Sequence, residues 1–154
     1  MSSARGFTLI ELTVVLVIAG LLFAISIPNL SAMSESLAYR SSVREVLSAA
    51  QSARREATRS GRAVDLLIDT KSRELAVRPA GSSDVGERLA LGGLTDLAVT
   101  SAAEVSPSAS VAGIRFYPFG GSTGGDIELM GPGGAGTLVQ VSWLMGDVRR
   151  SELR

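Results

Sequence analysis

The residue whose type and position most strongly suggest chemistry is Glu11, a carboxylate at the start of a long uncharged run. The run covers residues 12–34, which is 23 positions without a charged side chain. A carboxylate in hydrocarbon is costly, so a residue of this kind normally has a function and an oppositely charged partner. The alternative is that Glu11 lies in the headgroup zone of a membrane and stays solvated.

Few other side chains suit catalysis or metal binding. The chain has no Cys and no His, which excludes disulfides, thiolate or imidazole metal sites and catalysis by a His base. Asp126 and Glu128 share one face of an expected strand, but two carboxylates are too few for a Ca²⁺ site. Residues 120–125 are Gly-rich yet lack the Lys of a P-loop and precede a strand, which favours a turn. We therefore predict no catalytic residue, no cofactor and no metal site.

Basic residues balance acidic ones across the chain, at fifteen of each. A neutral total gives no general attraction to nucleic acid or to anionic membranes, so such binding would need a local patch. The candidate patch is a basic tail formed by Arg149, Arg150 and Arg154. We interpret it as a solvated terminus, with weak DNA contact as the alternative.

The uncharged run predicts a transmembrane helix. At about 1.5 Å per residue, residues 12–34 extend roughly 34 Å as a helix, which is enough to cross a bilayer core. Arg5 and the amino terminus precede the run, which predicts a cytoplasmic N-terminus and an external C-terminus. A secretory signal peptide cleaved near residues 24–26 is the alternative, and Glu11 and the very short basic region disfavour it. Pro28 predicts a kink or local unwinding of this helix.

The helix is expected to continue beyond the membrane. Small and apolar residues recur at spacings of four and three, which predicts one face of an amphipathic helix. Ser60 and Gly61 then supply a stop signal with Gly at the C-terminal cap. The result is one helix of about 50 residues. Its apolar stripe consists of Tyr39, Val43, Val46, Ala50, Ala53 and Ala57.

After Gly61 the period changes to that of strands. Residues 63–68 and 73–78 predict a hairpin, and residues 126–130 and 137–144 predict a second hairpin. Further strands are expected at 88–91, 97–100 and 113–117. Trp143 is expected in the core or at an interface edge. Strands that follow one long helix predict an α+β architecture in which the helix covers an antiparallel sheet.

The opening residues, Arg5-Gly6-Phe7-Thr8-Leu9-Ile10-Glu11, resemble the processing signal of type IV prepilins and type II secretion pseudopilins. The resemblance implies cleavage between Gly6 and Phe7 by prepilin peptidase and N-methylation of Phe7. Gly6 suits a narrow protease cleft because it has no Cβ. Within this interpretation, Glu11 is neutralised by the Phe7 amine of a neighbouring subunit, which favours one register of helices in a fibre.

The C-terminal half is similar to the GspH/FimT family. The similarity rests on residues 113–120, 138–143 and 146–149, and residues 49–61 fit as well. Some pilins of this family bind DNA through a Gly-Arg-x-Arg loop. Here Asp147 stands in the first Arg position, and a carboxylate there repels phosphate, which disfavours DNA binding.

Together these resemblances imply a minor pseudopilin of type II secretion, a structural subunit at or near the tip of a periplasmic pseudopilus that supports protein export across the outer membrane. The expected parts are a leader (1–6), a transmembrane half-helix (7–34) and a periplasmic head (35–154), which comprises an amphipathic helix (35–60) and a β-rich part (62–154). The expected partners are other minor and major pseudopilins, prepilin peptidase, the inner membrane and the secretion machinery. The alternatives are a minor pilin of a type IV pilus and a DNA-uptake pilin.

Overall fold

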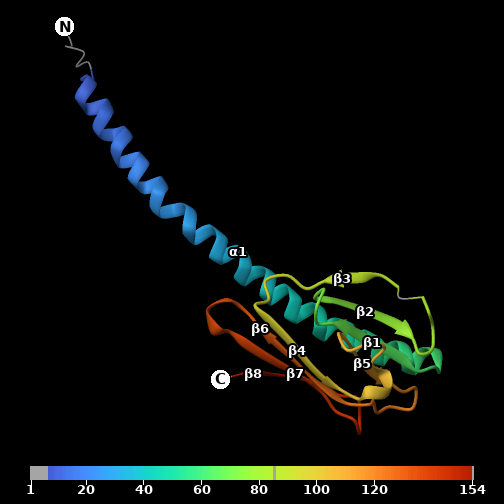
Figure 1. Cartoon of the computed structure of the whole chain (residues 1–154). Coiled ribbons are helices and arrows are strands. Elements are labelled where there is room, and N and C mark those ends of the chain that lie inside the picture. The colour runs from blue at the N-terminus through green and yellow to red at the C-terminus, as the bar shows by residue number, and fades with distance from the viewer. Residues whose placement is uncertain (1–6, 85, 154) are drawn as a thin grey trace. The chain divides into compact units, whose positions relative to one another are not determined.

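The computed structural model describes the backbone of residues 7–84 and 86–153, and the side chains of these except residues 24–32. Within these residues a long helix precedes eight strands and two short 3₁₀ helices (Figure 1). The chain divides into two compact units, Met1–Ser34 and Glu35–Arg154, and we call the second unit the head. The predicted α+β class, with a long helix packed on antiparallel sheets, is confirmed.

Helix α1 runs from Leu9 to Ser60. It ends as predicted, because Gly61 takes a left-handed conformation (φ 66°) that suits a glycine at the C-terminal cap. The helix is continuous through Pro28, so the local unwinding predicted there does not occur. The side chains around Pro28 lie outside the described residues, and the kink stays a prediction.

The buried stripe of α1 lies in the head, where all six of its residues are buried. Tyr39 anchors one end of it: the Tyr39 hydroxyl donates a hydrogen bond of 2.8 Å to Thr137 Oγ1. Gly131 allows this close approach, since a Cβ at that position would lie 2.6 Å from the Tyr39 ring. The small alanines further along the stripe likewise let the sheets approach the helix backbone closely.

The first sheet has the strand order β3-β2-β1-β5, and all neighbours are antiparallel. Strand β1 is buried on both faces: Leu66 and Ile68 belong to the core beneath α1, while Asp65 and Leu67 on the other face are also buried. The 3₁₀ helix η1 (Ala103–Val105) packs against β5. The strands are β1 (Val64–Asp69), β2 (Glu74–Pro79), β3 (Arg88–Ala90) and β5 (Val111–Phe116).

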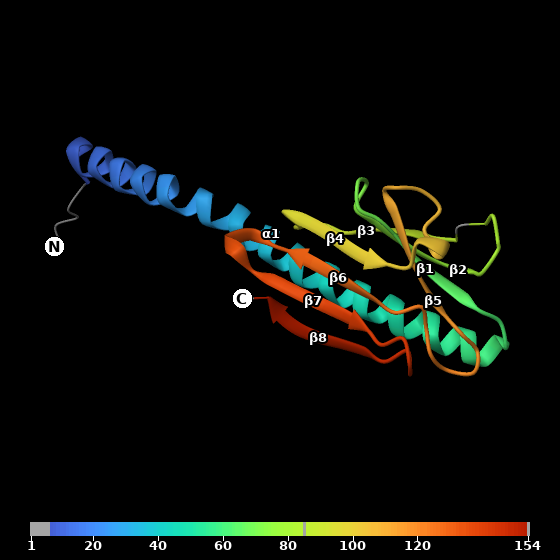
Figure 2. The same cartoon turned by 60° about the horizontal axis from the view of Figure 1, so that its bottom comes forward.

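The second sheet has the order β4-β6-β7-β8 and is also antiparallel throughout (Figure 2). Its inward side chains, together with those of the first sheet and the α1 stripe, form one hydrophobic core. The second 3₁₀ helix, η2 (Pro132–Gly134), connects β6 to β7. The strands are β4 (Asp96–Ser101), β6 (Gly125–Met130), β7 (Gly136–Val141) and β8 (Val148–Leu153).

The C-terminal region differs from the sequence predictions in three places. Residues 149–153, expected as a solvated terminus, form most of strand β8, which pairs with β7, and Arg149 and Arg150 on this strand are exposed. The predicted strand 137–144 ends at Val141, because residues 142–147 form a turn in which the Ser142 N–H donates to the Asp147 carbonyl (2.9 Å). Trp143 therefore lies in a loop with 71% of its surface exposed, which excludes the predicted core position, while the alternative position at an interface edge stays a prediction.

Candidate functional site

The described N-terminal residues place Glu11 in the first turn of α1. Its backbone N–H donates to Thr8 Oγ1 (3.3 Å), so Thr8 caps the helix. A carboxylate in the first turn also interacts favourably with the helix dipole. Gly6, on the leader side of the predicted cleavage point, lies outside the described residues, whereas Phe7 is described and its side chain is 83% exposed.

The first unit presents apolar side chains to its surroundings over most of its described length. Within the described residues, no helix is long and apolar enough to cross a membrane. The predicted span 12–34 includes residues 24–32, whose side chains lie outside the description, and it stays a prediction. The exposed large apolar residues of this unit are Phe7, Leu9, Ile10, Leu12, Val14, Val15, Leu16, Val17, Ile18, Leu21, Leu22, Phe23 and Met33.

The arginines of the predicted basic tail do not converge. Arg149 and Arg150 are adjacent on β8, so their side chains leave opposite faces of the sheet. Arg150 lines a hollow of about 570 Å³ with Arg40 and Arg44, and Arg149 lines another of about 430 Å³ with Arg54 and other residues. Arg154 lies outside the described residues. DNA contact by this cluster stays a prediction.

Asp147 pairs with a residue of α1. Its Oδ1 lies 3.0 Å from Arg54 Nη1. Both side chains are about 40% exposed, so the pair contributes at most about 1 kcal/mol to stability. The pair nevertheless joins the loop before β8 to the helix. Sequence reasoning gave Asp147 only a repulsive role toward phosphate and missed this contact.

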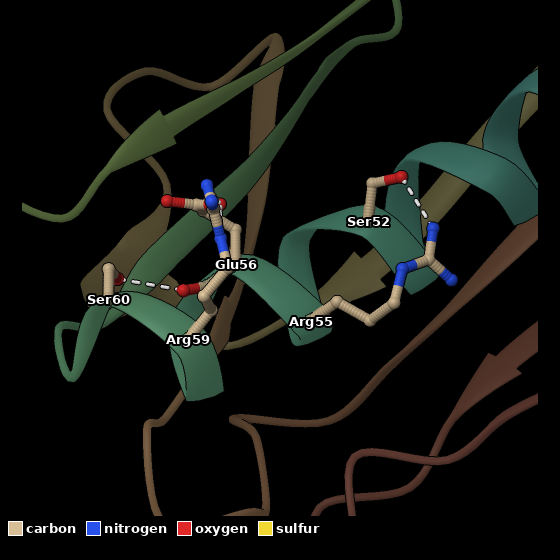
Figure 3. A network of polar contacts seen from close by, with 5 residues as sticks. All are labelled: Ser52, Arg55, Glu56, Arg59 and Ser60. Carbon is tan, nitrogen blue, oxygen red and sulfur yellow. Dashed lines mark hydrogen bonds and ion pairs between the residues drawn. The ribbon is translucent and has the colours of Figure 1, made fainter.

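Polar contacts also brace the last turns of α1 (Figure 3). Arg59 donates two hydrogen bonds to Glu56 Oε2, and these bonds raise the pKa of Arg59 above its ordinary value. The Ser60 hydroxyl donates to the Glu56 carbonyl (2.7 Å), and Arg55 donates to Ser52 Oγ (3.0 Å). Because Ser52 is neutral, its hydrogen bond leaves the charge of Arg55 uncompensated.

A buried ion pair in the first sheet was also missed. Arg115 on β5 donates to both carboxylate oxygens of Asp65 on β1, at 2.6 and 2.9 Å. The two residues are register partners across the strands. The hydrogen bond to Asp65 raises the pKa of Arg115, although partial burial opposes the rise. The pair is structural, because it holds two strands together and lines none of the hollows described above.

The described residues contain no group of three or more His, Cys, Asp or Glu side chains that could hold a metal ion. Asp126 and Glu128 do lie on one face of β6, as predicted, and Asp126 accepts a hydrogen bond from Gln140 (3.2 Å). The Gly-rich stretch 120–125 is a turn before β6, also as predicted.

Two loops at one end of the head expose large apolar side chains that sequence reasoning did not group together. The first connects β5 to β6 and the second connects β7 to β8. We call their exposed side chains the apolar loop cluster. The available signal was the content of both loops, which carry large apolar residues between turn-forming glycines. The cluster consists of Tyr117, Phe119, Trp143, Leu144 and Met145.

Comparisons with known proteins agree with this architecture. The chain resembles the minor pseudopilin EpsH of the type 2 secretion system of Vibrio cholerae, with a TM-score of 0.56 and 16% identity over 74% of this chain and 96% of that chain. It also resembles the type IV minor pilin FimU of Pseudomonas aeruginosa, with a TM-score of 0.57 and 17% identity over 77% of this chain and 92% of that chain. At these identities the likeness shows the fold. No curated protein matches the sequence.

Two family models match the sequence itself. The prokaryotic N-terminal methylation motif covers residues 1–27 and implies a pilin precursor anchored in the inner membrane. The model of type II transport protein GspH covers residues 42–145, which is more than half of the chain. The chain therefore belongs to the GspH family, the non-enzymatic minor pseudopilins of type II secretion systems.

Proposed function

We propose that the chain is cut between Gly6 and Phe7, methylated on Phe7, and held in the inner membrane by one helix with a cytoplasmic N-terminus and a periplasmic head. The family implies processing by prepilin peptidase and assembly with other pseudopilins. Support for the cleavage point comes from Gly6, which offers an extended backbone without a Cβ to a protease cleft.

In this proposal the mature chain is a structural subunit at or near the tip of a periplasmic pseudopilus that supports protein export across the outer membrane. The observation that carries it is the exposed apolar surface of the first unit. Such a surface requires a covering. Lipid covers it in the stored monomer, and packing against neighbouring helices replaces lipid in the fibre.

In this assembly Glu11 sets the axial offset between the helices of neighbouring subunits. Among the described residues of the single chain, no ion pair involves Glu11. A carboxylate at the border of an apolar helix is stabilised by a cation. The methylated amine of Phe7 on the next subunit supplies that cation when the two helices are offset along the fibre axis.

The test uses a strain that lacks this chain, complemented with the full chain or with Glu11→Leu. We expect the wild-type chain to restore export, and we expect Glu11→Leu to be processed normally but to crosslink poorly into pseudopili. Glu35→Leu makes the same chemical change at an exposed position of α1 in the head and should assemble normally.

Unchanged export in the deletion strain would contradict the secretion role. Loss of pilus-dependent motility, with export intact, would instead favour the type IV pilus alternative. Normal crosslinking of Glu11→Leu into pseudopili would contradict only the proposed role of Glu11 and would leave the secretion role standing.

A further inference from the structure

The apolar loop cluster combines exposed side chains with a buried backbone. Phe119 is fully exposed (101%) and Trp143 is 71% exposed. In contrast, the small residues Gly121, Ser122 and Gly124 of the first loop are buried. An ordinary surface loop shows the reverse, with polar side chains outward and a solvated backbone. The large apolar side chains are therefore presented outward by a packed support.

Hydrogen bonds fix the two loops to each other. The Ser122 N–H donates to the Trp143 carbonyl (2.9 Å), and the Ser122 hydroxyl donates to the Ser142 carbonyl (3.0 Å). Gly121 has a φ of 79°, and a Cβ there would lie 3.1 Å from the Trp143 carbonyl oxygen. The cluster is thus preorganised, which lowers the entropic cost of binding.

The size of the cluster suits a protein interface. Five large apolar side chains, three of them aromatic, expose an area on the order of 700 Å² together. This total approaches one side of a standard protein interface, about 800 Å² per partner. Trp, Tyr, Phe and Met are also the residue types enriched in interface cores.

Basic residues border the cluster on one side. The hollow next to the second loop is lined by Arg54, Arg55 and Arg149, with Asp147 as its carboxylate. Arg54 is paired with Asp147, and for Arg55 and Arg149 no ion pair occurs among the described residues. This border therefore carries a positive charge beside an apolar surface.

We propose that the apolar loop cluster docks into an apolar hollow on the head of a different pseudopilin. Carboxylates of the partner border that hollow and face Arg55 and Arg149 of this chain. This proposal rests on the proposed assembly into a pseudopilus. A two-fold contact between two copies of this chain would bring like-charged arginine borders together, which is unfavourable.

Charge also favours a protein partner over nucleic acid or lipid. Residues 117–124 and 142–147 carry a single charged side chain, the carboxylate of Asp147, so the cations without an ion pair that border the cluster among the described residues are Arg55 and Arg149. Phosphate recognition needs several cations close to the stacking residues. Attraction to an anionic lipid surface likewise needs clustered Lys or Arg.

The test places a photo-crosslinking amino acid at position 119 of the full chain, in cells that carry the complete secretion system. Phe119 makes no packing contact that its replacement could remove, since it is fully exposed. We expect crosslinks to another pseudopilin, at a peptide that contains or adjoins Asp or Glu. Leu89, an exposed apolar residue on β3, is the control position and should give no such product.

Binding is then measured between the purified full chain in detergent and the pseudopilin so identified. Phe119→Ser and Trp143→Ser should each weaken binding at least tenfold, as expected for aromatic anchors. Leu89→Ser should leave it unchanged. Arg55→Glu should weaken binding, and reversal of the facing carboxylate to Arg in the partner should restore it.

Several outcomes would overturn the proposal: crosslinks to lipid, to DNA or to a second copy of this chain, or no protein product above the Leu89 control. If the Phe119→Ser and Trp143→Ser chains bind the other pseudopilin and restore export as well as wild type, the docking role fails while the proposed function stands. If the deletion strain exports normally, the proposed function itself fails.

Discussion

Replacing Arg115 should destabilise the head strongly, because the substitution leaves a buried carboxylate without its cationic partner. The Asp65 side chain is only 2% exposed and loses two charged hydrogen bonds, of 2.6 and 2.9 Å, when Arg115 is replaced by Leu. Breaking a buried pair in this way costs about 3–5 kcal/mol. Because Arg115 is itself 30% exposed, we expect the lower end of that range, about 3 kcal/mol.

The reverse change should cost less. In Asp65→Leu the remaining guanidinium reaches water, so we expect a loss of about 1 kcal/mol. The double variant leaves neither charge buried and should be more stable than Arg115→Leu alone. A matched control is Arg88→Leu, which breaks the exposed Arg88–Glu74 pair (3.5 Å) and should cost less than about 0.5 kcal/mol.

The assay is urea unfolding of residues 35–154, followed by circular dichroism, with all four variants compared at equal m-values. The head is a compact unit with its own core, which makes it a suitable fragment. Additive effects of the two single changes would show that the Asp65–Arg115 pair contributes no coupling. An Arg115→Leu head as stable as wild type would refute the reasoning outright.

Four further predictions concern other residues. Gly6→Ile should leave the precursor uncut in cells with active prepilin peptidase, as mass spectrometry of the membrane-extracted chain would show. Ala50→Arg should cost several kcal/mol in urea unfolding, because Ala50 is fully buried against the sheets. The Asp69 carboxylate accepts a hydrogen bond from the Lys71 N–H, which lowers the pKa of Asp69. Asp69→Ala should therefore lower the free energy of unfolding by about 1 kcal/mol near pH 7, and by progressively less below about pH 4, because the wild-type carboxylate becomes protonated there. Unfolding measured as a function of pH checks this. The wild-type head should bind duplex DNA weakly at most and not at physiological salt, whereas Asp147→Arg should bind more tightly with a steeper salt dependence, measured by fluorescence anisotropy.

The helix and its buried face were predictable because they depend on local spacing. The recurrence of apolar residues from Tyr39 to Ala57 defines a helical face without reference to any other element. Gly61 marks the end of α1 by its own backbone preference. The first hairpin was predictable for a similar reason, since Asp69 and its neighbours form a turn between two strand-like segments.

Strand β8 and the buried ion pair depend on contacts that are distant in sequence. Arg149, Arg150 and Glu152 give β8 no apolar alternation, and its strand conformation comes from pairing with β7. Asp65 would lie on a solvated face if the first sheet were covered by α1 alone. It is buried because β1 is covered on both faces, and the sequence of β1 does not reveal the second covering.

Asp147, in the loop between β7 and β8, bears on both the DNA-binding alternative and the proposed docking surface. Asp147 departs from the Gly-Arg-x-Arg pattern, and that departure disfavours phosphate binding. The same carboxylate pairs with Arg54 and ties the loop to α1. The backbone of the same loop also accepts a hydrogen bond from Ser122 at the Trp143 carbonyl, and Arg55 and Arg149 line the hollow beside Asp147. Asp147 thus fixes the loop that carries Trp143 to α1, and its carboxylate is the reason why we expect little DNA contact.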